Sequence, residues 1–331
     1  MKLPFRLSIG RQHIPILATL AVLILVFAFG AIRHGDRNFA SLYNIVSLFR
    51  GGAVIGIAAI GSTFIILSKG IDLSVGAVIA LTTTIIAVLV SPQLGPGWHP
   101  AVVIPIALVI GTLFGTAQGC LIHFFELPPF LVTLAGMFLA RGLAFSVHPQ
   151  NIAIEHDAFH AMQSIGIPLG RSDVPLAVIV LLVFYAIAMF VSRYTNFGRE
   201  VYTIGGDEPS ARLMGVNIGR VKIGVYALGG LTAALAGVIA TIDRGDGSPS
   251  EFVGYELDAI AAVVIGGTLL TGGVGFMIGT LLGVLILGLI RLIIDNEGTL
   301  SSWWTNISAG ALLFGFILLQ TVLVRLAKRS G

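Results

Sequence analysis

The sequence contains few charged residues, and this scarcity excludes an ordinary soluble globular protein. Of its 331 residues, only 11% are Asp, Glu, Lys or Arg, whereas 56% are apolar. Soluble domains carry about 25% charged residues. Uninterrupted apolar runs of about 20 residues are typical of helices that cross a bilayer, while the strands of a membrane barrel alternate in polarity. The composition therefore predicts an all-α, polytopic integral membrane protein.

The sequence also lacks the features of several kinds of active site. Its single cysteine, Cys120, excludes an internal disulfide and any site with several cysteine ligands. There is no Gly-Lys dipeptide, and hence no phosphate-binding loop of the type G-x-x-x-x-G-K-[ST]. We therefore expect any ATP hydrolysis to take place on another chain, and we expect no cofactor here.

Histidines are scattered, with one exception. His156 and His160 are spaced as i and i+4, so a helix could place them on one face as metal ligands. The alternative, which we favour, is that both lie on a solvated surface, so we expect no metal site. No Ser/His/Asp set can be assembled from the spacing, and nothing in the sequence indicates an enzyme.

The apolar runs predict about ten transmembrane helices in a single membrane domain over residues 1–331. They lie near residues 14–31, 45–68, 73–91, 101–124, 130–147, 175–193, 223–242, 256–271, 274–294 and 304–325. Most of the 19 Lys and Arg residues fall in loops on the side of the N-terminus. The positive-inside rule then predicts that both termini are cytoplasmic.

Two apolar regions are interrupted in a similar way. Residues 65–75 and 264–275 each break a hydrophobic hairpin with glycines and small polar residues. On the predicted topology the second and seventh helices run in opposite directions, so helices 2–5 and 7–10 could form an inverted repeat. Transporters with this architecture have their substrate path at the interface between the repeats.

Six residues near these interruptions are candidates for lining a translocation path. Charges that border or interrupt apolar spans are costly and are functional candidates by default, and glycines can let a path open and close. The six are Asp72, Ser74, Arg141, Asp258, Gly266 and Gly267.

Each candidate has a structural alternative. Asp72 or Ser74 could cap the third helix, and the glycines could allow close helix packing. Arg141 could snorkel, pair with a carboxylate such as Asp258, or face a watery cavity. These alternatives remain open from the sequence.

One long polar stretch, residues 193–222, separates two apolar runs and carries five basic and three acidic residues. We expect it to be a cytoplasmic loop. Within it, a turn at residues 205–207 is followed by Pro209, and Gly215 can end a short helix. A helix of about two turns is not stable alone in water. It could rest on the membrane surface or insert into a groove of a partner protein.

Four stretches carry a likeness to a known family: GIDLSVG (70–76), LAGMFLARG (134–142), GREVYTIGGDEPSARLMGVNI (198–218) and LDAIAAVVIGGTLLTGGVG (257–275). The chain resembles the permease subunits of sugar ABC importers of the ribose type. With GTLSSWWTNI (298–307) included, it is most similar to permeases of galactofuranose importers.

The resemblance implies an inner-membrane permease that moves a monosaccharide, such as galactofuranose, into the cytoplasm by alternating access. It implies three partners: a cytoplasmic ABC ATPase, a periplasmic sugar-binding protein and a second permease subunit, identical or different. By the same resemblance, the helix that couples to the ATPase falls on Gly205, Gly206, Asp207, Glu208, Pro209, Ala211, Arg212, Leu213, Met214 and Gly215. Lys69-Gly70 replaces the family's usual pair of glycines, which predicts a less tightly packed turn.

The alternative is an ion-coupled secondary carrier for a small polar solute. That class buries acidic or histidine relays near the middle of the membrane. The sequence places Asp72 and Asp258 near the ends of spans, which favours the ATP-driven permease.

Overall fold

The computed structural model describes residues 14–35, 38–170, 172–298 and 303–329. This part of the chain forms helices joined by short turns, with two small two-stranded sheets at one end. The helices are α1 (Ile14–Arg33), α2 (Leu42–Leu67), α3 (Val75–Val90), α4 (Pro100–Phe124), α5 (Pro129–Val147), α6 (Asp157–Gln163), α7 (Leu176–Tyr194), α8 (Asn196–Gly206), α9 (Glu208–Leu213), α10 (Ile218–Arg244), α11 (Tyr255–Ile265), α12 (Met277–Glu297) and α13 (Trp303–Arg329). The strands are β1 (Ile152–Ala153), β2 (Gly166–Leu169), β3 (Ser172–Pro175) and β4 (Asp246–Gly247).

The predicted all-α class is confirmed, and each of the ten predicted spans corresponds to a helix. Seven helices of the described residues are long and apolar enough to cross a membrane: α1, α2, α4, α5, α7, α10 and α12. Helix α3, with 16 residues, is apolar but shorter than these seven. The span predicted over residues 256–271 extends too far, because α11 has only 11 residues and ends at Ile265. Gly267 then takes a φ of 91°, which takes the backbone out of the helical region.

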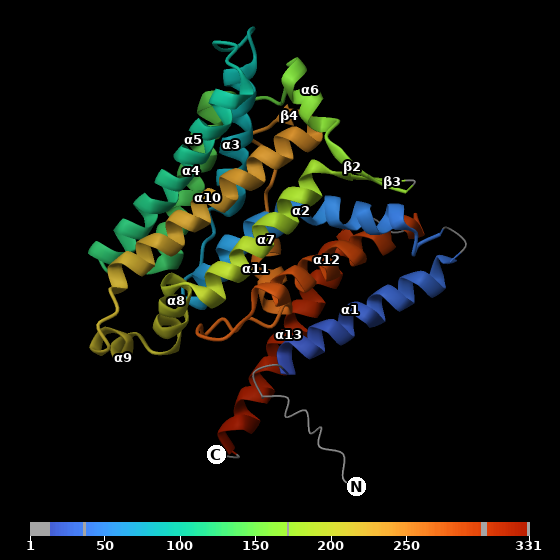
Figure 1. The fold of residues 1–331 in the computed structure, drawn as a ribbon. Coiled ribbons are helices and arrows are strands. Elements are labelled where there is room, and N and C mark those ends of the chain that lie inside the picture. Colours follow the sequence, from blue (N-terminus) through green and yellow to red (C-terminus); the bar gives the residue numbers. More distant parts are fainter. Residues whose placement is uncertain (1–13, 36–37, 171, 299–302, 330–331) are drawn as a thin grey trace.

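Helix α10 lies at the centre of the bundle, where it packs against α2, α3 and α4 (Figure 1). Small residues make the closest contacts possible. A Cβ on Gly115 of α4 would collide with the carbonyl oxygen of Tyr226, and one on Gly230 would collide with the carbonyl oxygen of Gly111. Glycines at such crossings let two backbones approach closely, as they do in many membrane helix pairs.

The two ends of the bundle differ, and we name them the α9 end and the α6 end. At the α6 end, β1 pairs antiparallel with β4, and β2 forms a hairpin with β3. His156, one of the two spaced histidines, caps α6 by accepting the backbone N–H of Ala158 at Nδ1. The α9 end carries α8 and α9, and Figure 1 shows the start of α1 and the end of α13 toward the same side.

We predict that Gly115→Ala destabilises the protein by about 1–3 kcal/mol, the cost of overpacking a well-packed core. The matched control is Gly142→Ala on α5, where a Cβ would have nothing within 4 Å. Alanine is the better helix former by about 0.5–1 kcal/mol, so the control should be neutral or stabilising. Thermal unfolding in mild detergent measures the difference; equal midpoints for both variants would contradict the packing account.

Candidate functional site

Two non-helical segments enter the helix bundle from opposite ends. The first re-entrant segment, residues 69–74, follows α2 from the α9 end. The carbonyl oxygen of Ile71 accepts hydrogen bonds from Tyr226 of α10 at 3.4 Å and from Thr133 of α5 at 3.3 Å. Asp72 Oδ2 lies 3.6 Å from the position of a Cβ on Gly229, close to the middle of the 27-residue α10. This segment therefore reaches deep into the protein.

The second re-entrant segment, residues 245–254, follows α10 from the α6 end. Ser248 donates its N–H to Thr83 Oγ1 of α3 at 3.4 Å. Further along, the carbonyl oxygen of Phe252 lies against Gly76, about two turns nearer the start of α3. Figure 1 shows this segment as an extended trace that runs beside α3 from β4 to α11.

The first turns of α3 and α11 meet where the two segments end. A Cβ on Gly76 would collide with both the Phe252 carbonyl oxygen and Glu256 Oε2. Helix N-termini carry partial positive charge and free N–H groups. Neither of these two helices has a side-chain hydrogen bond from its N-cap residue, Ser74 in α3 and Gly254 in α11. We call this place the central junction.

Asp72 and Ser74 lie together in the central junction. Asp72, 5% exposed, accepts at Oδ1 from both the N–H and the hydroxyl of Ser74, each at 2.7 Å. Ser74 Oγ also lies 3.3 Å from Gln118 Oε1 of α4. Asp72 thus binds the residue that precedes α3, close to the predicted capping role. Its predicted place near the end of a span is wrong, because residues 70–74 continue into the bundle without helical structure.

Arg141 does not pair with Asp258. Its Nη1 donates to the carbonyl oxygens of Pro249 and Glu251, at 2.6 Å each, and so ties α5 to the second re-entrant segment. Those carbonyls have no helical partner, and a guanidinium carries several donors. Arg141 therefore satisfies a non-helical backbone inside the bundle.

The remaining path candidates lie elsewhere. Asp258 lines a separate cavity with Arg291 of α12 and Asn306 of α13. A Cβ on Gly266 would collide with the backbone of Gly279 in α12, so this glycine serves close packing. The geometry thus favours the packing alternative for Gly266 and a turn for Gly267.

Sequence reasoning did not select Glu256, which the structure places in the central junction. Its side chain is 9% exposed and accepts at Oε1 from the N–H of Gly254 at 3.2 Å. Among the described residues, Oε2 has no hydrogen-bond partner. Glu256 and Asp258 are two residues apart and so point to different sides of α11. Only packing decides which one faces α3.

At the α9 end, the predicted turn at residues 205–207 is wrong. Gly205 and Gly206 are the last residues of α8, which the sequence did not predict. Asp207 caps α9 by accepting the N–H of Ser210 at 2.8 Å. Hydrogen bonds from the side chain and the backbone of Ser210 hold the pKa of the Asp207 carboxyl below its usual range.

Helix α9 has six residues, close to the predicted two turns, and its two sides differ. Pro209 lies in its first turn as predicted, and Gly215 follows it with a φ of 83°. Ala211 is fully buried, whereas Leu213 is 89% exposed. The carboxylate of Glu208 lies 2.9 Å from Lys222 of α10 and 3.8 Å from Arg212.

The predicted coupling residues therefore divide into two groups. Ala211 and Glu208 attach α9 to the bundle, while Leu213 and Met214, 66% exposed, project from it. Only the projecting group presents apolar surface to a partner.

Comparison with known proteins agrees with this architecture. A family model described as "Branched-chain amino acid transport system / permease component" matches residues 44–317. The chain belongs to this permease family. It is 42% identical to the inner membrane ABC transporter permease protein YjfF of Escherichia coli (strain K12), over 94% of this chain and 92% of the relative.

Two further relatives carry the names of sugars. The ribose import permease protein RbsC of Haemophilus influenzae is 38% identical, over 86% of each chain. The fructose import permease protein FruG of Bifidobacterium longum is 36% identical, over 95% of this chain and 92% of the relative. No solved structure matches the chain. The protein is thus a multi-pass permease and not an enzyme, and ATP hydrolysis belongs to a separate subunit.

In this permease, the end of α8 touches the turns that follow α2 and α11. A Cβ on Gly205 would collide with the carbonyl oxygen of Leu67, and Gly273 donates its N–H to that same oxygen at 2.9 Å. Lys69 Nζ donates to the carbonyl oxygen of Gly206 at 3.2 Å. We call these contacts, between residues 67–70, 205–206 and 272–273, the three-way junction.

The turn at Lys69-Gly70 is closed by a backbone hydrogen bond. Gly70 donates its N–H to the carbonyl oxygen of Ile65 at 2.8 Å. Lys69 takes a φ of 66°, a conformation that favours glycine. The bond from its side chain to Gly206 offsets part of this backbone cost.

We predict that Lys69→Gly is more stable than Lys69→Met by about 1 kcal/mol, because glycine accepts the left-handed conformation that methionine finds costly. Both variants lack the ammonium, so their comparison isolates the backbone term. Thermal unfolding in detergent provides the measurement. A higher midpoint for Lys69→Met would show that the turn carries no such strain.

Proposed function

We propose that this permease imports a monosaccharide across the bacterial inner membrane, driven by a cytoplasmic ABC ATPase. The relatives named for ribose, fructose and xylose support a sugar as the substrate class. Galactofuranose is the most specific candidate. It is supported by the likeness at residues 298–307, of which 299–302 lie outside the described residues.

The observation that carries this proposal is the construction of the α9 end. A short helix projects exposed Leu213 and Met214 on one side and is fixed to α10 by the Glu208–Lys222 ion pair on the other. An apolar helix face of this kind fits a groove on a partner protein. In the proposed importer the partner is the ATPase.

The proposed orientation places the α9 end in the cytoplasm, together with both termini. The basic residues of the polar stretch, Arg193, Arg199, Arg212, Arg220 and Lys222, support it, since cytoplasmic loops carry an excess of Lys and Arg.

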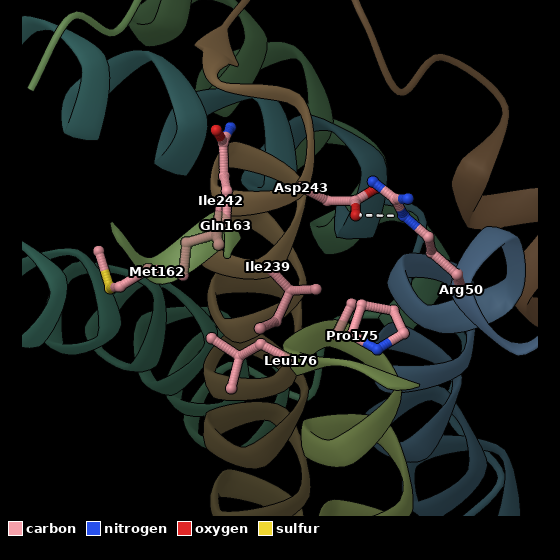
Figure 2. A pocket seen from close by; sticks show the side chains of 9 residues that line it. Arg50, Met162, Gln163, Pro175, Leu176, Ile239, Ile242 and Asp243 are labelled. Atoms are coloured by element: carbon pink, nitrogen blue, oxygen red, sulfur yellow. Dashed lines mark hydrogen bonds and ion pairs between the residues drawn. The ribbon is translucent and has the colours of Figure 1, made fainter. Parts of the chain in front are cut away.

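The α6 end would then receive the sugar-binding protein. Figure 2 shows a pocket there whose lining includes Gln163 of α6, Pro175 of β3 and Ile239 of α10. Beside it, Arg50 of α2 and Asp243 of α10 form an ion pair at 2.7 Å. This pair joins the two long helices from which the re-entrant segments continue.

In the proposed cycle, movement of α9 reaches the central junction through the three-way junction. The turn at residues 67–70 contacts the end of α8 and continues directly into Asp72. A second permease subunit would supply the other wall of the path, and tilting of the pair would expose the path to each side in turn.

An ion-coupled carrier is the second candidate, favoured by one observation. Asp72 and Glu256 are buried carboxylates deep in the bundle, as in proton- or sodium-coupled transporters. Uptake that persists without ATP and collapses with an ionophore would establish this alternative.

We predict that uptake requires the complete importer. The permease, its ATPase and its binding protein are reconstituted in liposomes and tested with labelled D-ribose, D-fructose, D-xylose and D-galactose. Uptake should require ATP and all of these components, because the described permease residues contain no nucleotide-binding loop. Full uptake by the permease alone would refute the proposal.

We predict that Leu213→Asp weakens ATPase binding at least tenfold, since a charge in the centre of an apolar contact costs more than about 1.4 kcal/mol. The protein should still fold, because the side chain is exposed. Leu94→Asp, at a 48% exposed leucine of the other end, is the matched control. Copurification of the ATPase gives the comparison, and equal recovery with both variants would count against α9 as the contact.

A further inference from the structure

Glu256 is a buried carboxylate with an open oxygen. Its Oε1 is engaged with Gly254, but Oε2, directed at the first turn of α3, has no hydrogen-bond partner among the described residues. Buried polar groups are almost always paired, and a carboxylate in the interior of a membrane protein is costly, so an unpaired one indicates a function. The proposed transport cycle assigns no role to Glu256 itself.

The groups around Oε2 define what could bind there. Asp72 contributes a second carboxyl group, which is close enough to Glu256 to interact with it. Arg141 donates from Nη1 to the carbonyl oxygens of Pro249 and Glu251, and its positive charge lies close enough to Glu256 to interact with it. The first turns of α3 and α11 contribute N–H donors and partial positive charge. The junction therefore offers strong acceptors next to donors.

This combination selects against ions. The carboxylates of Glu256 and Asp72 would repel an anion, while the charge of Arg141 and the partial positive charges of the two helix N-termini offset the attraction for a cation. A hydroxyl group both donates and accepts a hydrogen bond, so it can satisfy a carboxylate oxygen and a backbone N–H together. A neutral solute with several hydroxyls matches the site best.

We propose that Glu256 is a specificity-determining residue that accepts a hydrogen bond from a sugar hydroxyl as the solute passes the central junction. The proposal rests on the proposed function, since it assumes that sugar is the substrate. In this structure α3 and α11 touch at Gly76, so Oε2 becomes available when the two re-entrant segments separate. A contact made only during passage would recognise hydroxyls without retaining the sugar.

The test compares Glu256→Gln with wild type in the complete reconstituted importer, with labelled D-ribose, D-fructose, D-xylose and D-galactose as probes. Two quantities are measured: ATP hydrolysis stimulated by the loaded binding protein, and sugar taken up per ATP hydrolysed. Asp295→Asn, at an exposed carboxylate of α12, controls for the loss of one negative charge.

We expect Glu256→Gln to retain stimulated ATP hydrolysis within about twofold and to lose about tenfold or more in uptake per ATP, the effect of weakening one hydrogen bond to a charged group. The control should match wild type in both. Unchanged uptake per ATP would overturn the proposal. So would a joint loss of uptake and stimulated hydrolysis, which would make Glu256 structural. If wild type takes up none of the probes with ATP, the proposed function itself fails.

A second variant tests the same position without requiring that a glutamine side chain fit there. Glu256→Cys is prepared with Cys120→Ser and treated with methyl methanethiosulfonate, a small neutral thiol reagent. Labelling should be faster during turnover, with ATP and loaded binding protein, than at rest, and excess sugar should slow it. Equal labelling rates at rest and during turnover would show that position 256 does not open to the path.

Discussion

Inside a membrane every backbone N–H and C=O needs a partner from the protein, and the two re-entrant segments depend on this constraint. Neither segment is helical where it passes through the bundle, so side chains provide the bonds that a helix would make for itself. Tyr226 and Thr133 donate hydrogen bonds to the carbonyl oxygen of Ile71. Arg141 donates hydrogen bonds to two carbonyl oxygens of the second re-entrant segment. Several of the polar residues buried in this apolar core, among them Asp72, Ser74, Thr133 and Ser248, therefore belong to the two interruptions or bond to them.

The same interruptions place two helix N-termini inside the protein. A continuous helix would bring its N-terminus to the membrane surface, where water and lipid headgroups screen it. Here α3 and α11 begin within the bundle, and their partial positive charge acts in an apolar surrounding where electrostatic effects are stronger. Asp72 and Glu256 are the carboxylates beside these two starts. The absence of a side chain at Gly76 allows the contact between them.

Periodicity and caps were sufficient to predict the long helices and the position of α9, because both signals are local, but they did not predict α8. The pairing of the interruptions was not local. The sequence pairs residues 65–75 with 264–275 by composition. In the structure, the counterpart of the segment after α2 is residues 245–254, which follow α10. The sequence of this segment resembles that of an ordinary loop. Burial alone distinguishes a re-entrant segment from a surface loop, and burial depends on α3 and α5. Packing likewise determines that Glu256, and not Asp258, faces α3, and this could not be predicted from the local sequence.

The three-way junction explains how a push at one end could act deep in the bundle. Gly205 has no side chain, so the end of α8 lies directly on the backbone of Leu67, and Leu67 in turn is bonded to Gly273. The turn after α2 leads into Asp72, while the loop containing Gly273 follows α11, the helix of Glu256. Contacts between two backbones deform less under a displacement than contacts between flexible side chains. In the proposed cycle, a displacement of α9 therefore moves both halves of the central junction together, and the junction opens only if they move by different amounts.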